Sequence, residues 1–166
     1  MINLTQAKPD TFSDTATHER LESADQIPLL FELYSKHMAK LCPSRSFDSA
    51  QFVAMMHRFL ESPEFDIWII RDSAGEISQY HVTQLDGLTL KAIITVYRED
   101  VYLPLAFADG QNIFKDIAAN TGCTRVHVSA HSSLVDVIPH IEAIYDRLAQ
   151  PKYTTNPDIL EFECLV

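Results

Sequence analysis

The stretch that decides the fold begins with Leu88-Thr-Leu-Lys-Ala-Ile-Ile-Thr-Val-Tyr97, continues through Arg98-Glu99-Asp100 and ends with Thr124-Arg-Val-His-Val-Ser-Ala130. Its first and last parts are rich in β-branched and apolar residues, which predicts two strands. Between them, apolar residues at helical spacing predict a helix over 104–120, and Thr121-Gly122 ends it. Strand, helix and strand form a parallel crossover unit, which brings a helix N-terminus beside a strand end. Many folds bind phosphate groups at such a junction.

Length, composition and charge limit the class of protein. The chain has 166 residues, 46% of them hydrophobic, and a formal net charge of −10. This length favours a single domain with a real core. Scattered Lys and Arg residues argue against nucleic-acid binding, which needs clustered positive charge, whereas an acidic surface suits a basic or amine partner. No apolar run approaches a membrane span and the N-terminus has no signal-peptide pattern, so we expect no membrane partner.

The cysteine content indicates the compartment. The three cysteines are far apart in the sequence: Cys42, Cys123 and Cys164. An odd number of widely separated cysteines in a chain of this size predicts reduced thiols and a cytoplasmic location.

The N-terminal part is predicted to hold a tail, a strand and two helices. Residues 1–15 are polar and form the expected tail, and residues 16–166 form the single domain. A short strand is expected over 17–22. Apolar residues at helical spacing then predict one helix up to residue 41 and a second from 48 to about 61.

Polar residues mark the start of both helices. Ser23 or Asp25 is predicted to cap the first helix. Asp48 is the predicted N-cap of the second, where Gln51 at the third helical position completes a capping box. The aromatic residues around this cap fit a hydrophobic staple: Phe47 and Phe52.

Three antiparallel strands are predicted next, over 67–71, 76–84 and 88–97. Asp86-Gly87 is a strong signal for a two-residue hairpin between the last two. The third strand leads into the crossover helix, in which Gly110 costs about 1 kcal/mol relative to alanine. A glycine at that point indicates a bend or a close backbone contact.

The C-terminal part is predicted to complete the sheet. A last helix is expected over 132–149, followed by a turn at 156–158 and a terminal strand over 159–165. The side chains that we expect to be mostly buried are Phe52, Phe59, Trp68, Ile94, Val96, Phe114, Ile117, Val126 and Val128.

Three stretches carry a resemblance to a known family. They are Glu22-Ser-Ala-Asp-Gln-Ile-Pro-Leu-Leu30, Val126-His-Val-Ser-Ala130, and Ala143-Ile-Tyr145-Asp-Arg-Leu-Ala-Gln-Pro-Lys-Tyr153 with Glu161-Phe162 after it. In this order they resemble the opening helix, the fifth strand and the Ala-x-x-x-Tyr segment of the GCN5-related N-acetyltransferase (GNAT) superfamily. The resemblance covers about residues 16–166, and small divergent members of this kind occur in bacteriophage genomes, some near virion genes.

The resemblance implies a fold, a cofactor and cofactor contacts. The fold is α/β (α+β), with a mixed, mostly antiparallel sheet flanked by helices, and the cofactor is acetyl-CoA. By position, the contacts fall on Val96, Tyr97, Arg98 and Leu105. In active members the fourth and fifth strands separate at their ends, the gap admits the pantetheine arm, and the next helix N-terminus receives the pyrophosphate.

The expected cofactor loop departs from the family pattern. The family has Arg/Gln-x-x-Gly-x-Gly/Ala, whose small residues let backbone N–H groups approach the pyrophosphate. Here the loop reads Arg98-Glu-Asp-Val-Tyr-Leu-Pro104, with no glycine. Glu99 and Asp100 stand where a polyanion would dock, and like charges ~4 Å apart repel by about 4 kcal/mol at an effective dielectric of 20. Arg98 can offset one of them. The loop either binds acetyl-CoA in an altered way or does not bind it.

The catalytic candidates follow from the same resemblance, and each has a structural alternative. Tyr145 matches the tyrosine that protonates the departing thiolate, or it is a core tyrosine. His131, at the end of the 124–130 strand, is a candidate general base or an exposed histidine, and Glu99 is a second candidate base. His127 and His131 lie roughly 13 Å apart along a strand at ~3.3 Å per residue, so they cannot share a metal ion and we expect no metal site.

Two functions from different classes remain open. One is an N-acyltransferase that moves an acetyl group from acetyl-CoA to an amine or protein substrate. The other is a catalytically silent GNAT-like domain that binds a protein partner, for example as an accessory or virion-associated protein of a bacteriophage in the host cytoplasm. Tyr145 favours the first function and the altered loop favours the second.

Overall fold

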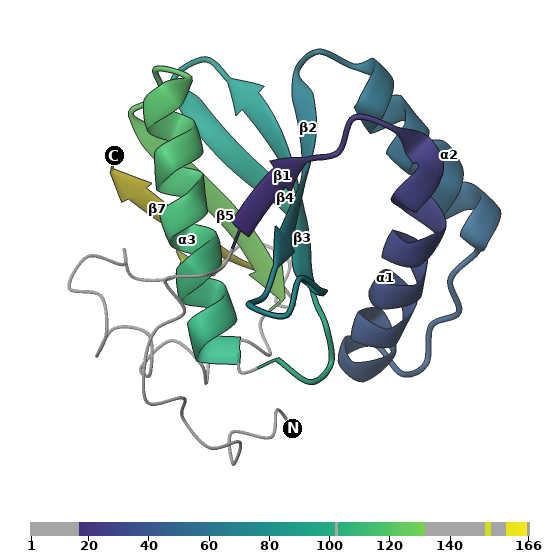
Figure 1. The fold of residues 1–166 in the computed structure, drawn as a ribbon. Helices are drawn as coiled ribbons and strands as arrows, with labels where there is room; N and C mark the ends of the chain where they lie inside the picture. Colours follow the sequence, from purple (N-terminus) through teal and green to yellow (C-terminus); the bar gives the residue numbers. More distant parts are fainter. Residues whose placement is uncertain (1–16, 102, 132–151, 154–158, 166) are drawn as a thin grey trace.

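The computed structural model describes residues 17–101, 103–131, 152–153 and 159–165 (Figure 1). The elements in chain order are β1 (Thr17–Arg20), a 3₁₀ helix η1 (Ala24–Gln26), α1 (Ile27–Leu41), α2 (Ser49–Glu61), β2 (Phe65–Arg71), β3 (Ile77–Asp86), β4 (Thr89–Tyr97), α3 (Leu103–Asn120), β5 (Arg125–His131), β6 (Lys152–Tyr153) and β7 (Ile159–Leu165). The expected tail, the expected helix over 132–149 and the turn at 156–158 lie outside the described residues.

One mixed sheet organises the fold. Its seven strands have the order β1-β2-β3-β4-β5-β7-β6. The β4–β5 pair is parallel and the other neighbouring pairs are antiparallel. The helix α3 makes the crossover between the two parallel strands, so the predicted crossover unit and the predicted fold class are confirmed.

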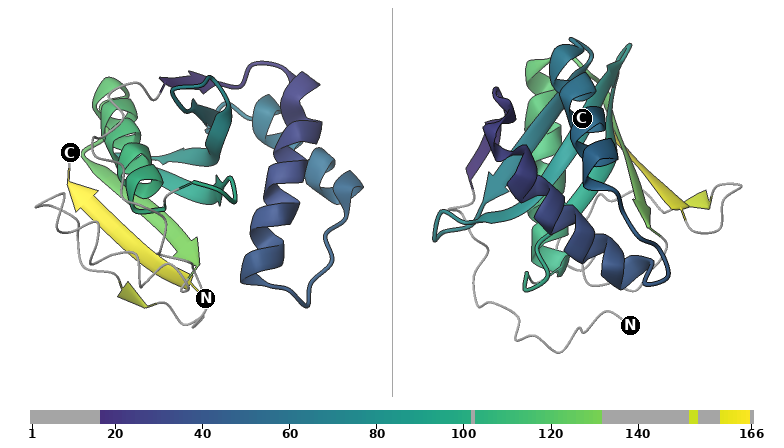
Figure 2. Two further views of the ribbon diagram at one scale, coloured as in Figure 1. Left: turned by 60° about the horizontal axis from the view of Figure 1, so that its bottom comes forward. Right: turned by 90° about the vertical axis from the view of Figure 1, so that its right-hand side faces the viewer.

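Helices cover both faces of the sheet. The pair α1 and α2 lies on one side and α3 on the other, as the two views of Figure 2 show. Successive side chains of a strand point to opposite faces, and β3 follows this rule. Tyr80 and Val82 belong to the apolar core beneath α1 and α2, whereas His81 points to the α3 face, where its ring contacts Phe114 with centroids 4.7 Å apart.

The predicted N-cap of α2 at Asp48 is confirmed. The carboxylate of Asp48 accepts hydrogen bonds from the backbone N–H groups of Ala50 and Gln51, at 2.8 and 3.3 Å. The expected staple takes a different form, because Phe47 and Phe52 each pack against Tyr34 of α1, with ring centroids 5.4 and 4.9 Å apart. These aromatic contacts join the two helices.

The start of α1 differs from the prediction. The N-cap of η1 is Ser23 and that of α1 is Gln26, and neither side chain makes a capping hydrogen bond. Instead, the Ser23 hydroxyl donates to the Asp25 carboxylate at 3.3 Å. The proline in the first turn of α1 explains why no cap is required there, since it removes one of the backbone donors that a cap would satisfy.

Most of the predicted core is buried. Six of the nine side chains expected there are at most 6% exposed: Phe52, Val96, Phe114, Ile117, Val126 and Val128. Phe59, Trp68 and Ile94 are only half-buried. Trp68 lies near the edge of the sheet, where it contacts His18 of the edge strand β1 at 5.8 Å between ring centroids. The thiols of Cys42 and Cys123 are free, and that of Cys164 lies outside the described part.

Candidate functional site

The parallel strands β4 and β5 pair only over their first residues. Their ladder runs from Thr89–Arg125 to Ala92–Val128. At the same point the register between β3 and β4 shifts, and Ile93 is the extra residue on β4. A bulge of this kind bends the strand that carries it. Within the described residues, no strand pairs with β4 on its β5 side over 93–97.

The predicted cofactor residues gather where β4 ends and α3 begins. Val96 and Tyr97 are the last residues of β4, and both are buried. The Tyr97 ring lies between His37 of α1 and His81 of β3, with centroids 5.9 and 6.1 Å away, and burial raises the pKa of its phenol. Leu105 lies in the first turn of α3, and its side chain is outside the described part.

Arg98 fastens the loop to the β2–β3 turn. Its Nη2 donates to the Asp72 carboxylate at 2.9 Å, its Nη1 to the Ile77 carbonyl at 3.1 Å, and its Nε to the Asp100 carboxylate. Partial burial acts to raise the pKa of Asp72, but hydrogen bonds from Arg98 and from backbone N–H groups lower it overall. Arg98 therefore offsets the charge of Asp100, as the sequence suggested, while each guanidinium nitrogen already has a partner.

Glu99 lies on the α1 side of the loop that follows β4. Its side chain is exposed, and its carbonyl accepts a hydrogen bond from Lys40 Nζ at 3.0 Å. It lines a hollow of about 350 Å³ between α1 and the β2–β3 turn. Leu29 and Leu33 of α1 form part of the apolar wall of this hollow.

The other catalytic candidates are not brought to Glu99 by any described contact. His131 is the last residue of β5, where its backbone pairs with Ile159 of β7. The parallel register places His131 three residues beyond Val128, at the same end of the sheet as Val96. Its side chain lies outside the described part, and Tyr145 lies outside the described residues.

A buried chain of polar side chains lies beneath α3, and the sequence analysis missed it. Gln79 Nε2 donates to the Ala106 carbonyl of α3 at 2.8 Å. Gln79 Oε1 lies 2.6 Å from His81 Nε2, and His81 Nδ1 lies 3.1 Å from Thr95 Oγ1 of β4. Because an amide oxygen can only accept, His81 donates from Nε2 and accepts the Thr95 hydroxyl at Nδ1.

The Gln79 and His81 part of this chain is enclosed, whereas Thr95 is half-buried. Gln79 and His81 are each 1% exposed. Burial lowers the pKa of His81 to about 3, so the imidazole is neutral near pH 7. Gly110 of α3 lies directly over the pair, since a Cβ at Gly110 would be 3.1 Å from Gln79 Oε1. The close backbone contact expected at Gly110 is therefore confirmed.

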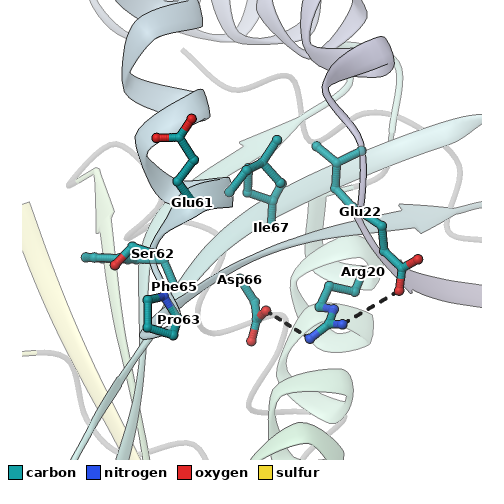
Figure 3. Close-up of a pocket in the computed structure, with 10 residues that line it drawn as sticks. Arg20, Glu22, Glu61, Ser62, Pro63, Phe65, Asp66 and Ile67 are labelled. Carbon is teal, nitrogen blue, oxygen red and sulfur yellow. Dashed lines mark ion pairs between the residues drawn. The ribbon is translucent and has the colours of Figure 1, made fainter.

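A hollow larger than the one beside Glu99 lies elsewhere in the described residues. Its volume is about 450 Å³, and it is lined by the ends of β1 and α2 and the start of β2. Figure 3 shows the side chains that line it. Arg20 lies between Glu22 and Asp66 there, at 3.6 and 3.5 Å. Since Phe65 pairs with Gln84, and Gln84 with Lys91, this hollow is at the opposite end of the sheet from the loop at 98–101. We therefore place the candidate site at the end of β4 and not in this hollow.

A metal-ligand cluster and a membrane-spanning helix are both absent from the described residues. No group of three or more His, Cys, Asp and Glu side chains there could hold a metal ion. No helix there is long and apolar enough to cross a membrane.

The arrangement of strands and helices matches that of solved acetyltransferases. An acetyltransferase from Thermus thermophilus superposes with a TM-score of 0.69 at 13% identity, covering 94% of this chain and 100% of its own. An acetyl transferase from Salmonella typhimurium, which modifies the N-terminal serine of ribosomal protein L7/L12, gives 0.66 at 10% identity over 94% of this chain and 98% of its own. A chimera of the Vibrio cholerae spermidine N-acetyltransferase SpeG with hSSAT gives 0.66 at 9% identity over 92% of this chain and 96% of its own.

These comparisons define the fold. By sequence, the chain matches no protein-family model and no curated protein. By structure, it has the GNAT-like fold: a mixed sheet whose β4 and β5 separate beyond a bulge, with helices on both faces.

Proposed function

We propose that the protein is an N-acyltransferase that moves an acetyl group from acetyl-CoA to an amine. The observation that supports this proposal most directly is the end of the β4–β5 ladder at Ala92 and Val128. Beyond it, the backbone N–H and C=O groups of β4 over 93–97 have no described strand partner on the β5 side. Such groups can hydrogen-bond the amides of a pantetheine arm, because extended peptide-like ligands bind open strand edges.

The residues around this gap supply the proposed roles. Val96 and Tyr97 form the wall at the end of β4, and the first turn of α3 with Leu105 faces the phosphate end. In the reaction, the amine nitrogen forms a bond to the thioester carbon and the carbon–sulfur bond breaks. We assign the proton lost by the amine to His131 or Glu99, and the proton gained by the sulfur to Tyr145.

The electrostatics of the loop support binding of an anion only in part. The single positive charge of Arg98 is shared between Asp72 and Asp100, whereas the carboxylate of Glu99 stays exposed beside the loop. Each uncompensated negative charge weakens binding of a polyphosphate by about 1 kcal/mol when water screens the pair at ~4 Å. The loop therefore lowers the affinity for acetyl-CoA without abolishing the site.

The acceptor is an amine in this proposal. Among the structural neighbours, one acts on spermidine and another on the N-terminal serine of a ribosomal protein. The net charge of −10 favours association with cationic substrates. A polyamine or a protein amino group fits both observations, and the proposed location is the cytoplasm.

The second candidate is a catalytically silent GNAT-like domain that binds a protein partner. It is favoured by the loop itself, which has no glycine between Arg98 and Pro104. The guanidinium of Arg98, placed where the family contacts the cofactor, is already bonded to Asp72 and Asp100. A bacteriophage accessory or virion-associated protein in the host cytoplasm belongs to this second class.

Titration calorimetry with acetyl-CoA decides between the two candidates. A ligand at 1 mM with a dissociation constant of ~10 μM also stabilises the native state by about 2.7 kcal/mol, which a thermal or urea unfolding curve detects. The N-acyltransferase should then release free thiol when polyamines or peptide amines are added. The absence of both heat and stabilisation at millimolar acetyl-CoA would leave the silent domain as the function.

A charge variant tests where the polyphosphate binds. Glu99→Gln should tighten acetyl-CoA binding about threefold to fivefold, because it removes a like charge at the loop. Glu64→Gln is the matched control, because this exposed glutamate lies at the opposite end of the sheet. Equal affinities of the two variants would show that the ligand does not approach the loop. If Glu99 is also the general base, Glu99→Gln lowers the turnover rate while the affinity still rises.

A further inference from the structure

The buried chain beneath α3 connects three separate parts of the candidate site. Gln79 lies on β3, Thr95 lies in the part of β4 that has left β5, and Ala106 lies in the first turns of α3. Each link is a hydrogen bond of 2.6 to 3.1 Å. The chain therefore ties the separated half of β4 to the start of α3, which are two walls of the proposed acetyl-CoA site.

We propose that Gln79, His81 and Thr95 are positioning residues that hold the separated half of β4 and the first turns of α3 at the spacing acetyl-CoA binding requires. This inference rests on the proposed function for its ligand, but the geometry that it explains does not. None of the three is assigned a contact with substrate.

The hydrogen-bonded chain of Gln79, His81 and Thr95 has one arrangement of donors and acceptors. The Ala106 carbonyl can only accept, so the Gln79 amide must turn its nitrogen to α3 and its oxygen to His81. His81 is then protonated at Nε2, and Nδ1 must accept from Thr95. Reversing any group would leave two donors or two acceptors facing each other in a buried layer. A chain with a single satisfied arrangement fixes the relative positions of the elements that it joins.

Packing limits movement of the same groups. Gly110 leaves no free space above Gln79 Oε1, because even a methyl group there would be 3.1 Å away. The ring of Phe114 stands edge-on against His81, with centroids 4.7 Å apart at an interplanar angle of 85°. The separated part of β4 pairs with β3 but lacks a described strand neighbour on its β5 side, so this hydrogen-bonded chain adds a side-chain link from that segment to α3.

A nearby hydroxyl offers a matched comparison. Thr83 lies on the same face of β3, is 1% exposed, and accepts a hydrogen bond from Trp68 Nε1 at 3.1 Å. Thr83→Val and Thr95→Val each remove one hydrogen-bonded hydroxyl and keep the shape of the side chain. The Thr83 bond joins β3 to β2 and touches neither α3 nor the separated half of β4.

The experiment compares Thr95→Val, Thr95→Ser and Thr83→Val in the full chain. Amide hydrogen exchange is measured over 93–97 and 103–110, and the dissociation constant of acetyl-CoA is measured by calorimetry. Thr95→Val should speed exchange in both segments about tenfold and weaken acetyl-CoA binding at least tenfold. Thr95→Ser, which keeps the hydroxyl, should restore the wild-type exchange rates and the wild-type dissociation constant of acetyl-CoA. Thr83→Val should lower the unfolding midpoint about as much as Thr95→Val does. It should leave the exchange rates over 93–97 and 103–110 and the dissociation constant of acetyl-CoA near those of the wild type.

The two measurements separate this inference from the proposed function. If the wild type does not bind acetyl-CoA, the proposed function fails. Hydrogen exchange alone then decides whether the hydrogen-bonded chain of Gln79, His81 and Thr95 holds the segments 93–97 and 103–110 in place. If Thr95→Val and Thr83→Val give the same exchange over 93–97 and 103–110, the positioning role is wrong. It is also wrong if exchange rises in Thr95→Val while the dissociation constant stays at the wild-type value.

Discussion

Gly110 of α3 and Gln79 of β3 are in direct contact: a Cβ added to Gly110 would lie 3.1 Å from Gln79 Oε1 and 3.5 Å from the Nε2 of His81. Gln79 cannot withdraw, because its amide is held at one end by the Ala106 carbonyl and at the other by His81. The helix therefore approaches the sheet at the one residue type that allows this distance.

The first prediction concerns this contact. Gly110→Ala should lower the free energy of unfolding by about 1–2 kcal/mol, because overpacking against a fixed side chain outweighs the gain of about 1 kcal/mol in helix propensity. Urea unfolding monitored by circular dichroism measures the change. Ala119→Gly, at an exposed site near the end of the same helix, is the control for propensity alone. An increase in stability for Gly110→Ala would mean that Gln79 is free to move.

The second prediction concerns acid. Burial lowers the pKa of His81 to about 3, below its ordinary value of 6.5. The unfolded state therefore binds a proton more readily between these two values, and this site loses stability as the pH falls from 6.5 towards 3, by about 1.4 kcal/mol per pH unit. The groups that face the ring are Gln79, Thr95, Phe114 and Tyr97, and burial raises the pKa of the Tyr97 phenol, so it does not titrate in this window.

The measurement for His81 is a difference between variants. The stability advantage of the wild type over His81→Gln should shrink as the pH falls from 6.5 to 4, in urea unfolding at each pH. His57→Gln, at an exposed position on α2, serves as the control. A pH-independent difference between wild type and His81→Gln would contradict the neutral buried imidazole.

The third prediction concerns Asp109, which precedes the contact glycine. Burial raises the pKa of Asp109 to about 6. Its folded pKa lies above the unfolded one, so the ionised form is unfavourable in the fold above pH 6 and the penalty disappears as the pH falls towards 3.8. Asp109→Asn should therefore raise the free energy of unfolding at pH 7.5 by about 1 kcal/mol, a value that allows for solvent screening of a half-exposed group.

The control for Asp109 is Asp116→Asn, at an exposed position on the same helix. The gain from Asp109→Asn should vanish near pH 4, where the Asp109 carboxyl is neutral in the fold. If Asp109→Asn and Asp116→Asn behave alike at pH 7.5, burial does not disfavour the charge of Asp109.

The fourth prediction concerns Arg98. Arg98→Ala should cost about 2 kcal/mol of unfolding free energy, because it leaves the Asp72 carboxylate and the Ile77 carbonyl without their charged donor. The Asp72 part is present above pH 3.8 and is lost as the pH falls below it, since the pKa of Asp72 is lowered in the fold. Arg58→Ala on α2 removes an exposed arginine bonded only within its helix, and should change stability by no more than about 0.5 kcal/mol.

The same variant limits how binding data are interpreted. Loss of acetyl-CoA affinity in Arg98→Ala alone would not separate a lost ligand contact from a displaced loop. Asp72→Asn keeps the arginine and removes its anchor. An affinity that falls in Arg98→Ala and is unchanged in Asp72→Asn would identify the guanidinium as a direct contact of the ligand.

Local sequence signals predicted the scaffold because the relevant interactions are local. The hairpin predicted at Asp86-Gly87 forms with a shift of one residue: Asp86 pairs with Thr89, so Gly87, with a φ of 59°, and Leu88 make the turn between β3 and β4. The Asp48 cap acts on N–H groups two and three residues away. The crossover between β4 and β5 follows from strand and helix periodicity.

The candidate site was harder to predict because its contacts are distant in sequence. Gln79, His81 and Thr83 alternate with the apolar Tyr80 and Val82, a pattern that is typical of a strand with one face in water. Here α3 covers the polar face, and Gly110 was the signal of a close approach between this helix and the sheet. The partner of Arg98 could not be predicted either, because Asp72 is 26 residues away and reaches it through the folding of a hairpin.

The short β4–β5 ladder also has a mechanical meaning. Within the described residues it joins two groups of antiparallel strands, β1 to β4 on one side and β5, β7 and β6 on the other. A force that pulls β4 and β5 apart acts on the few backbone hydrogen bonds from Thr89 to Ala92, whereas the neighbouring β3–β4 and β5–β7 ladders distribute it over more residues. The helix α3 contacts both β4 and β5 and so bridges these two strands. The sheet is therefore held by fewer strand contacts at the β4–β5 pair than at the ladder on either side of it, and α3 limits how far a ligand that enters there can push the two strands apart.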